Sequence, residues 1–544
     1  MKNRIAGFTV IILCLLTLQL YSQTLKRPKL VVGIIVDQMR YDYLYRFYNY
    51  YGNDGFKRLM NHGSNFTYAH FNYIPTYTGP GHSSVYTGTT PFYHGIIGND
   101  FFDKKSGKMI YCVSDTTEKT IGSNDDEGEM SPKRLMATTI TDQIKLATNG
   151  KSKVISISLK DRAAVLPGGH WANAAYWYDS KTGGFITSSY YMKALPSWVE
   201  NFNNEKLADK YLSKGWKLFK PEADYQNTAP DNSPFENDVF NEGKTTFPHS
   251  FSNVKQNEKY GVLETSPYGN QIVEEFVKAA LKNEDLGKGK ETDFLAVSFS
   301  STDYVGHAYG NYSYELEDTY LRLDAQIADL LKALDNQVGK GNYLLFFTAD
   351  HAVLDTPGYL KEHRLPTGEL GYKKAIDSLN AFTIRSFGDK NLIENISNNQ
   401  IFFNRQVIKE KNLNIHKVEQ TYADYLRDTF PAIASIFTRD DLEKQTANRT
   451  TTNLTLNGFN PARSGDIAIT LQPGYLMSFM KKGTTHGAPY TYDTHVPMIF
   501  YGWHVPTQIV NKPVYIVDIA ATVASLLNIT EPSACIGIPL IKQE

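Results

Sequence analysis

The sequence predicts an α/β fold in which a mostly parallel central sheet is covered by helices on both faces. Three observations support this. Strongly apolar runs each end in polar or charged residues, amphipathic patterns lie between them, and 41% of the 544 residues are hydrophobic, enough for a sizeable core. Continuous apolar runs rich in β-branched and aromatic residues are typical of strands buried on both faces. The expected strands are 30–36, 154–159, 294–299, 343–348 and, more weakly, 467–471 and 496–501.

Helical patterns occupy the intervals between the expected strands. Segments 314–334 and 272–281 each carry one apolar stripe at helical spacing. Asp518 is expected to cap a final helix that runs to Leu527. Ligands of such sheets bind beyond the carboxyl ends of the strands, and several polar residues of this sequence follow the expected strands. We therefore expect the functional residues at that edge of the sheet.

Two stretches interrupt the alternation of strands and helices. Residues 165–265 contain four of the five tryptophans and many Tyr, Asn, Asp and Pro residues. Residues 352–465 are polar, with scattered helical periodicity. Insertions of this kind usually tune substrate choice. We expect both to form a cap around the active-site rim of one catalytic domain, residues 24–544.

The N-terminus has the pattern of a secretory signal peptide. Lys2 and Arg4 precede an uncharged, mostly apolar stretch over residues 5–20, and polar residues follow at Ser22 and Gln23. A membrane anchor is the alternative, although the stretch is short for a spanning helix. We expect residues 1–23 to be a signal peptide. The protein is then exported to the periplasm, the cell surface or the medium, without a stable membrane anchor.

Charge and cysteine content restrict the partners. The formal net charge of −1 gives no reason to expect binding to nucleic acid, and we expect a monomer. Cys112 and Cys535 remain after residue 23. An oxidising compartment permits a disulfide between them, which the sequence does not decide. Two thiols are too few for a cysteine-based zinc site, so any metal must be held by histidines and carboxylates.

Six residues are candidate metal ligands, and four of them follow expected strands. They are Asp37, Asp303, His307, Asp350, His351 and His486. A single Asp-His pair is more often a capping or solvated pair, and a lone histidine is more often a core residue. Together, however, carboxylates and imidazoles without thiolates are typical of hydrolytic zinc sites with open positions. Six such groups would hold two ions, which clamp the attacking and leaving oxygens of an in-line displacement.

Thr78 is the candidate nucleophile. It lies in I-P-T-Y-T-G-P-G-H-S-S, where two prolines and two glycines exclude a regular element through the threonine. Its hydroxyl needs an activator at neutral pH, and a bound metal ion supplies one. The structural alternative is that Thr78 caps a helix near residues 81–86. His82, Ser83 and Ser84 are interpreted as packing residues at the start of that helix rather than as a catalytic triad.

Seven motifs, in order along the chain, resemble those of the alkaline phosphatase superfamily. They are D-x-M-R, P-T-x-T-G-P-G-H, G-N-D, S-L-K-D-R, D-Y-x-G-H, T-A-D-H and T-H-G-x-P-Y-x-Y-D-T-H-V-P. The sequence most resembles the phosphate-irrepressible alkaline phosphatases of Bacteroidetes, a monoesterase branch with a threonine nucleophile. That branch is related to the type I phosphodiesterases and nucleotide pyrophosphatases. The resemblance runs from Asp37 to the C-terminus and implies an alkaline-phosphatase-like three-layer α/β/α fold with two zinc ions.

The resemblance also implies a role for each matching residue. One zinc would be held by Asp303, His307 and His486. The other would be held by Asp37, Asp350, His351 and the Oγ of Thr78. The phosphoryl group would be contacted by Asn99, Lys160 and Arg162. Asp161 would orient its loop. His495 would be structural or would support a ligand from behind, rather than bind a metal itself.

The activity implied is that of an alkaline phosphatase (EC 3.1.3.1), which hydrolyses small phosphate monoesters with broad specificity, through a phosphothreonine, to scavenge phosphate. The first alternative is a nucleotide pyrophosphatase/phosphodiesterase, which shares the fold, the metals and the threonine. Lys160 with Arg162 favours the monoesterase, because a diester phosphate carries less charge. The remote alternative is a non-catalytic secreted metal-binding protein. Structural zinc sites are normally closed by four protein ligands, whereas each ion here would have about three.

Overall fold

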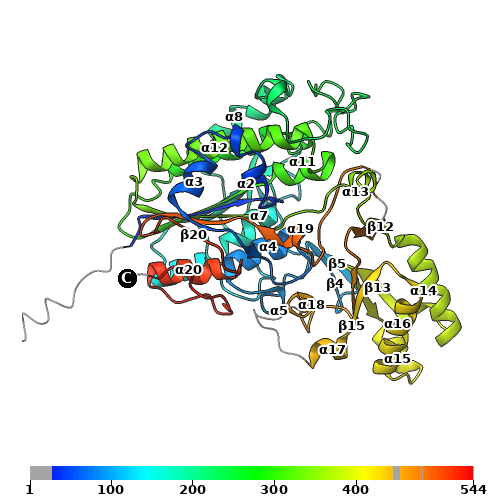
Figure 1. Cartoon of the computed structure of the whole chain (residues 1–544). Coiled ribbons are helices and arrows are strands. Elements are labelled where there is room, and N and C mark those ends of the chain that lie inside the picture. Colours follow the sequence, from blue (N-terminus) through cyan, green and yellow to red (C-terminus); the bar gives the residue numbers. More distant parts are fainter. Residues whose placement is uncertain (1–26, 445–453, 478–479, 481, 543–544) are drawn as a thin grey trace, which may run out of the picture.

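A computed structural model describes residues 27–444, 454–477, 480 and 482–542 (Figure 1). The core of the fold is a ten-stranded sheet in the order β20-β2-β19-β11-β1-β10-β7-β8-β9-β6. Its five central strands are parallel. They are β11 (Tyr343–Thr348), β1 (Leu30–Val36), β10 (Asp293–Phe299), β7 (Val154–Ser158) and β8 (Ala174–Asp179).

The sheet becomes antiparallel at both edges. Strand β19 (Met498–Gly502) is antiparallel to β11, so the expected strand at 496–501 exists but runs against its neighbour. On the same side lie β2 (Ser64–Phe66) and β20 (Gln508–Val510), and the opposite edge is formed by β9 (Gly184–Ser188) and β6 (Thr120–Ile121).

Strand β1 occupies the middle of the sheet and is buried at all seven positions. Its apolar sequence LVVGIIV fits a strand covered on both faces. Gly33 is required there, because a Cβ would lie 2.4 Å from the Phe346 ring and 2.5 Å from the Tyr86 hydroxyl. The strand is therefore held tightly and fixes the residue that follows it.

Helices cover both faces of the sheet, which confirms the predicted three-layer α/β/α architecture. In Figure 1, α12 (Tyr314–Gln337) lies above the sheet and α20 (Asp518–Leu527) below it. Helix α10 (Pro267–Asn283) packs against α12, and α4 (Thr78–Thr87) packs against α7 (Asp161–Gly168). The segments with helical periodicity at 272–281 and 314–334 lie inside α10 and α12.

The predicted cap at Asp518 is wrong in detail. Asp518 is the first helical residue of α20, and Val517 occupies the N-cap position without a side-chain cap bond. The Asp518 carboxylate instead accepts hydrogen bonds from the backbone N–H groups of Tyr515 and Ile538. It joins the neighbouring segments to the helix start.

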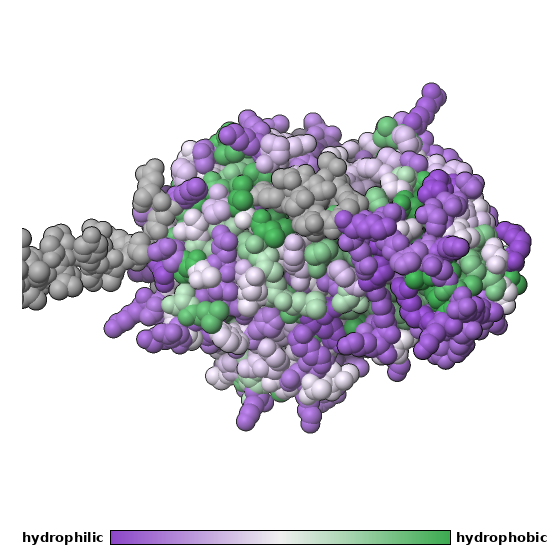
Figure 2. Space-filling view, turned by 90° about the horizontal axis from the view of Figure 1, so that it is seen from below, coloured by the Kyte–Doolittle hydropathy of each residue, from purple (hydrophilic) through white to green (hydrophobic). Residues whose placement is uncertain are grey.

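A second, antiparallel sheet has the order β13-β14-β16-β15 and a hydrophobic core of its own. Its strands are β13 (Ile393–Ser397), β14 (Gln400–Phe403), β16 (Ile467–Leu471) and β15 (Ile433–Thr438). Its helices are α14 (Tyr372–Phe387), α15 (Arg405–Glu410), α16 (Ile415–Thr429) and α17 (Arg439–Glu443). We call these elements the side unit. It lies at the right of Figure 1, and hydrophilic residues predominate on its visible face in Figure 2.

The side unit extends beyond the expected insertion at 352–465, because the run at 467–471 forms β16 of this second sheet. The expected insertion at 165–265 differs as well, since β8 and β9 inside it belong to the central sheet. Trp177 and Trp216 are buried in the protein core, and only Trp171 is largely exposed. These tryptophans therefore support the fold rather than an open binding surface. The division of residues 24–544 into one catalytic domain with two cap insertions stays a prediction.

The predicted signal peptide, residues 1–23, lies outside the described residues. Within the described part of the chain, no helix combines the length and apolar character that crossing a membrane requires. Within the described part of the chain, Cys112 and Cys535 are not joined by a disulfide.

Candidate active site

The carboxyl ends of β1 and β11 bring the first candidate ligands together. The two strands are parallel neighbours with Ile35 opposite Thr348, so Asp37 and Asp350 follow them at the same edge of the sheet. Asp37, Asp350 and His351 are all completely buried. We call these three residues the buried group.

The donor atoms of the buried group converge on one point. One donor atom of each residue lies within 4.8 Å of the other two. His351 Nε2 is 3.5 Å from Asp37 Oδ1 and 3.4 Å from Asp350 Oδ2. Among the described residues, none of these three atoms has a hydrogen-bond partner. Unpartnered buried polar atoms are costly, and a cation between them would satisfy all three, so the donor set fits a metal ion.

The second set of candidate ligands lies beside the first. Helix α11 (Ser301–Tyr309) places Asp303 and His307 one turn apart, with Asp303 Oδ1 3.1 Å from His307 Nε2. His486 Nε2 is 3.8 Å from the same oxygen. We call Asp303, His307 and His486 the open group, because the His307 side chain is 33% exposed.

The two groups adjoin at two stacked imidazoles. The rings of His351 and His486 are parallel within 16° and 3.5 Å apart. Donor atoms of Asp303, His351 and His486 also lie within 4.8 Å of one another, so His351 borders both groups. The six predicted ligands are therefore brought together, and His351 has a more central position than the prediction gave it.

Backbone carbonyls orient the three imidazoles. The Nδ1 atoms of His307, His351 and His486 lie 2.7, 3.1 and 2.6 Å from the carbonyl oxygens of Thr484, Ala352 and Thr76. Because a carbonyl only accepts, each Nδ1 carries the proton and donates it. Each Nε2 then presents a lone pair to the carboxylates, which is the tautomer that binds a metal.

The electrostatics of the site also favour the neutral forms of His351 and His486. Burial lowers the pKa of His351 to about 3, and burial together with the neighbouring imidazoles lowers the pKa of His486 well below its usual range. Burial likewise lowers the pKa of His307, but the Asp303 carboxylate outweighs it and the net pKa is raised. Burial and the charge of Asp37 raise the pKa of Asp350 well above its usual range. Positive charge is therefore what this site lacks.

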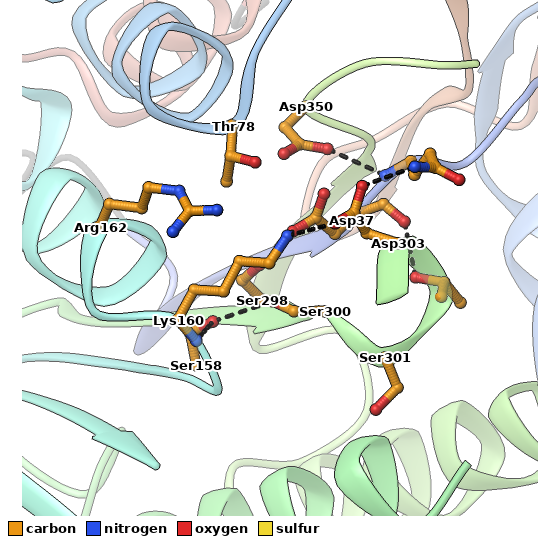
Figure 3. A network of polar contacts seen from close by, with 12 residues as sticks. Asp37, Thr78, Ser158, Lys160, Arg162, Ser298, Ser300, Ser301, Asp303 and Asp350 are labelled. Carbon is orange, nitrogen blue, oxygen red and sulfur yellow. Dashed lines mark hydrogen bonds and ion pairs between the residues drawn. The ribbon is translucent and has the colours of Figure 1, made fainter. Parts of the chain in front are cut away.

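Lys160 supplies part of that charge. Its Nζ lies 2.6 Å from Asp37 Oδ2 and 2.6 Å from Asp303 Oδ2, and so bridges the buried and open groups (Figure 3). Burial lowers the pKa of Lys160, but the two carboxylates outweigh burial and the net pKa is raised. The bridge uses one oxygen of each carboxylate and leaves both Oδ1 atoms facing the imidazoles.

Thr78 is the first residue of α4 and is 1% exposed. The prediction that no regular element runs through Thr78 is therefore wrong, because the helix starts at the threonine rather than near residues 81–86. Tyr77 before it forms no side-chain cap bond. The helix start packs against the buried group, since a Cβ at Gly81 would lie 2.3 Å from the Asp350 carbonyl oxygen. Figure 3 shows Thr78 between Asp350 and Arg162, with its hydroxyl directed toward the carboxylates.

His82 lies one turn beyond Thr78 and has a structural role. Its Nδ1 is 3.0 Å from the Thr78 carbonyl oxygen, and its Nε2 is 2.9 Å from Ser298 Oγ. Burial lowers the pKa of His82 to about 4. Both nitrogens are thus engaged with groups other than the Thr78 hydroxyl, as the packing interpretation predicted.

Asn99 and Arg162 border the Thr78 side of the site. Asn99 Oδ1 accepts a hydrogen bond of 2.8 Å from the backbone N–H of Gly79, so the amide NH₂ group points elsewhere and remains a donor. Arg162 Nη1 is 3.0 Å from the Tyr111 hydroxyl, which in turn donates to Asp161. Asp161 therefore positions Arg162 through Tyr111, a link that the sequence did not reveal.

Gln38 is a site residue that the sequence analysis missed. Its Nε2 donates to Asp303 Oδ1 over 2.6 Å, and its backbone N–H donates to Asp350 Oδ1 over 3.1 Å. It thereby fixes one carboxylate of each group. The backbone of Gln38 has a φ of 64°, a conformation that residue type alone does not predict. Its position directly after Asp37 was the only available signal.

A cavity of about 370 Å³ opens beside the open group. His307, His486 and Tyr77 line one side of it. Its lining also includes Ile469 to Leu471 of β16 and the segment from Tyr475 to Met477. The side unit therefore contributes directly to the space next to the ligands, which the sequence predicted only as a cap around the rim.

His495 lies apart from both ligand groups, as predicted. Its Nε2 is 2.9 Å from the Thr67 carbonyl oxygen, and its ring stacks on His70 with centroids 4.7 Å apart. It is a packing residue at the junction of β18 (His495–Val496) and β3 (Ala69–His70).

Comparisons with known proteins agree with this architecture. Residues 31–495 match the family model described as type I phosphodiesterase / nucleotide pyrophosphatase. The chain is 46% identical to alkaline phosphatase PhoV of Synechococcus elongatus over 522 residues, which cover 95% of this chain and 93% of that protein. It is 42% identical to alkaline phosphatase PafA of Elizabethkingia meningoseptica, with 95% of each chain covered.

The crystal structure of wild-type PafA superimposes on the chain with a TM-score of 0.91, covering 95% of this chain and 99% of that one. These matches confirm the resemblance to the alkaline phosphatase superfamily and the predicted fold. The chain therefore belongs to the type I phosphodiesterase/nucleotide pyrophosphatase family.

Proposed function

We propose that this protein is an alkaline phosphatase that hydrolyses small phosphate monoesters with broad specificity. The observation that carries the proposal is the buried group, in which three unpartnered donor atoms converge next to the Thr78 helix. The names of PhoV and PafA, at 46% and 42% identity over nearly the whole chain, support it.

The proposed cofactors are two zinc ions. The buried group with Thr78 Oγ would hold one ion, and the open group would hold the other. Carboxylate and imidazole donors with the Nε2 lone pairs turned inward are a suitable zinc set. When bound, the two ions would supply positive charge to the reacting oxygens and lower the pKa of the nucleophilic groups.

Thr78 would act as the nucleophile. Its deprotonated hydroxyl oxygen attacks phosphorus in line and forms a new O–P bond, while the ester O–P bond breaks and the leaving oxygen takes a proton from solvent. A water oxygen then forms a bond to phosphorus from the opposite side and the Thr78 O–P bond breaks. A proton of the water returns to the Thr78 oxygen as inorganic phosphate leaves. The buried position of Thr78 at a helix start fixes the direction of attack before the substrate arrives.

Three side chains would stabilise the charge on the phosphoryl oxygens. The free amide NH₂ group of Asn99 would donate to one oxygen, and the Arg162 guanidinium would donate to others. Lys160 would add positive charge from its position between Asp37 and Asp303. A monoester dianion gains the most from such a set, because its transition state is highly charged.

The alternative function is that of a nucleotide pyrophosphatase/phosphodiesterase, which is included in the name of the matching family. Arg162 and Lys160 beside Thr78 favour the monoesterase. The comparison of kcat/KM for an aryl phosphate and an aryl phosphodiester decides between them, and a higher value for the diester would refute the monoesterase proposal.

The direct test of the proposal is Thr78→Ala. We expect the substitution to lower kcat/KM for monoesters by at least about 10³-fold, because the covalent step is lost. Bound zinc should remain near the wild-type content, since six other ligands persist. Unchanged turnover would remove Thr78 from the mechanism.

A chelator separates this function from that of a non-catalytic secreted metal-binding protein. Activity should disappear on chelation at a temperature where circular dichroism stays native, and should return with added zinc. The proposal also includes export, to the periplasm or beyond, of a monomer that scavenges phosphate. Cell fractionation and size-exclusion chromatography test these last points.

A further inference from the structure

The side unit contains another group of possible metal ligands, separate from the active site. His416 and Glu419 lie one turn apart on α16, and Asp440 is the second residue of α17. One donor atom of each residue lies within 4.8 Å of the other two. His416 Nδ1 and Asp440 Oδ2 are 2.6 Å apart. Strand β15 lies between the two helices in the sequence, so the fold of the side unit brings these ligands together.

Glu419 provides a second, independent observation. The residue is 1% exposed, and its Oε2 has no hydrogen-bond partner among the described residues. Burial and the nearby charge of Asp466 raise the pKa of Glu419 to about 7. A buried carboxyl oxygen without a partner is costly, and a cation would remove that cost.

We propose that His416, Glu419 and Asp440 bind one divalent transition-metal ion, such as Zn²⁺, at a site independent of the catalytic centre. One imidazole nitrogen and two carboxylate oxygens form a suitable donor set. The ion takes the place of the direct contact between His416 Nδ1 and Asp440 Oδ2, with the imidazole proton carried on Nε2. The two carboxylates balance its double positive charge.

The geometry also allows an ion to enter. The His416 side chain is 61% exposed and that of Asp440 is 29% exposed, so one edge of the site faces solvent. Water would complete the coordination at this edge. Among the described residues, Lys444 places its Nζ 4.0 Å from Asp440 Oδ2, on a side chain that is 76% exposed. A flexible exposed lysine is a weak competitor for a chelated ion.

Binding would join α16 to α17 on either side of β15. Strand β15 pairs with β16, which contributes Ile469 to Leu471 to the cavity wall beside the open group. The ion is therefore expected to stabilise the wall of the substrate cavity without touching the reacting groups.

The experiment measures bound zinc in the full-length protein. Metal-free protein is dialysed against micromolar Zn²⁺, and zinc per chain is determined by inductively coupled plasma mass spectrometry. We expect His416→Ala to bind one zinc equivalent fewer than the wild type. The matched control is His363→Ala, which removes another exposed histidine, at the end of α13 (Pro357–Glu362), and should keep the wild-type content. Equal zinc in wild type and His416→Ala would overturn the proposal.

Two further measurements guard against a folding artefact. Glu419→Gln keeps the size of the side chain and should weaken binding of this zinc at least about tenfold, measured by calorimetry. Crystals of the wild type soaked in Zn²⁺ should show an anomalous peak between the three side chains at the zinc edge. The absence of that peak would also overturn the proposal. The variants leave the catalytic ligands unchanged and the anomalous peak is located at this site, so the comparison does not depend on what the catalytic centre binds.

Discussion

The buried group and the open group use the same kinds of ligand but differ in how they are held. Asp37, Asp350 and His351 follow two adjacent strands of the central sheet and are completely buried. In the open group, His307 is partly exposed, and His486 lies on a loop that lines the cavity. One side of the centre is therefore fixed by the sheet, whereas the other faces space that a substrate can fill.

This difference suggests a division of tasks. The buried group lies against the helix that carries Thr78, so it is suited to hold the nucleophile in one position. The open group adjoins the cavity, so it is suited to meet leaving groups of different size. Substitutions in the buried group should then lower kcat/KM equally for every substrate. Substitutions in the open group should lower kcat/KM by amounts that differ between substrates.

The largest expected effect contrasts one histidine from each group. His351→Ala removes the imidazole that borders both groups and should lower kcat/KM by roughly 10⁴-fold for all monoesters. His307→Ala should lower kcat/KM roughly 10²-fold. Part of this activity should return at higher zinc concentration, because the position of His307 is accessible to water. Kinetics with two leaving groups, together with zinc content, measure both effects. Equal losses with no zinc rescue would contradict the contrast.

Arg162→Ala tests the charge on the Thr78 side of the centre. We expect kcat/KM for an aryl monoester to fall by about 10²-fold, because a charged donor to the phosphoryl oxygens is lost. The value for an aryl diester should fall much less. A matched control is Arg463→Ala, in which the replaced guanidinium contacts the Gly95 carbonyl oxygen instead of the site. Parallel losses for both substrates with Arg162→Ala would argue against phosphoryl contact.

Gln38→Asn tests the residue that connects the two groups. Asparagine tolerates the positive φ of this position but is too short to keep the bond to Asp303. We expect a loss of about tenfold in kcat/KM, typical of a residue that orients a ligand. Gln38→Glu is the paired variant, since it keeps the length but loses the donor and adds charge. If Gln38→Asn retained full activity, the orienting role would be wrong.

The smallest expected effect concerns Asp493, which holds the His486 loop. Its Oδ2 accepts hydrogen bonds from Gly487 and Ala488, and burial raises its pKa to about 8. Between its usual pKa and about 8, the folded state holds a proton that the unfolded state releases, so this carboxyl lowers stability as pH rises. Asp493→Asn should make Tm fall less between pH 5 and pH 8 than in the wild type, with monoesterase activity changed by less than about threefold. An unchanged pH dependence of Tm would contradict this assignment.

The sequence predicted that the candidate ligands lie together, because most of their positions depend on local pattern. Asp37 and Asp350 each follow an apolar run, and adjacent parallel strands bring such positions together. The proximity of Asp303 and His307 required only one helical turn. The role of Gln38 was not predictable, because it depends on a backbone angle and on two carboxylates that are distant in the sequence.

Local pattern also could not predict which strands the weakly predicted strands would pair with. The run at 467–471 reads as a strand, but nothing in its periodicity tells whether it joins the central sheet or a second one. It pairs with β14 and β15 instead, and this pairing places β16 at the cavity wall. The alternation of strands and helices likewise indicated a parallel sheet but could not reveal that β9 and β19 run in the opposite direction.

The carbonyl groups that hold the three imidazoles belong to the main chain, and every amino acid supplies one. Point mutations at positions 76, 352 and 484 cannot delete these acceptors and can only displace them. The acceptors themselves persist whatever residue stands at these three positions, as long as the path of the chain persists. The ring at position 486 is anchored to residue 76, two residues before the threonine that begins α4, so any shift of that segment moves ligand and hydroxyl together.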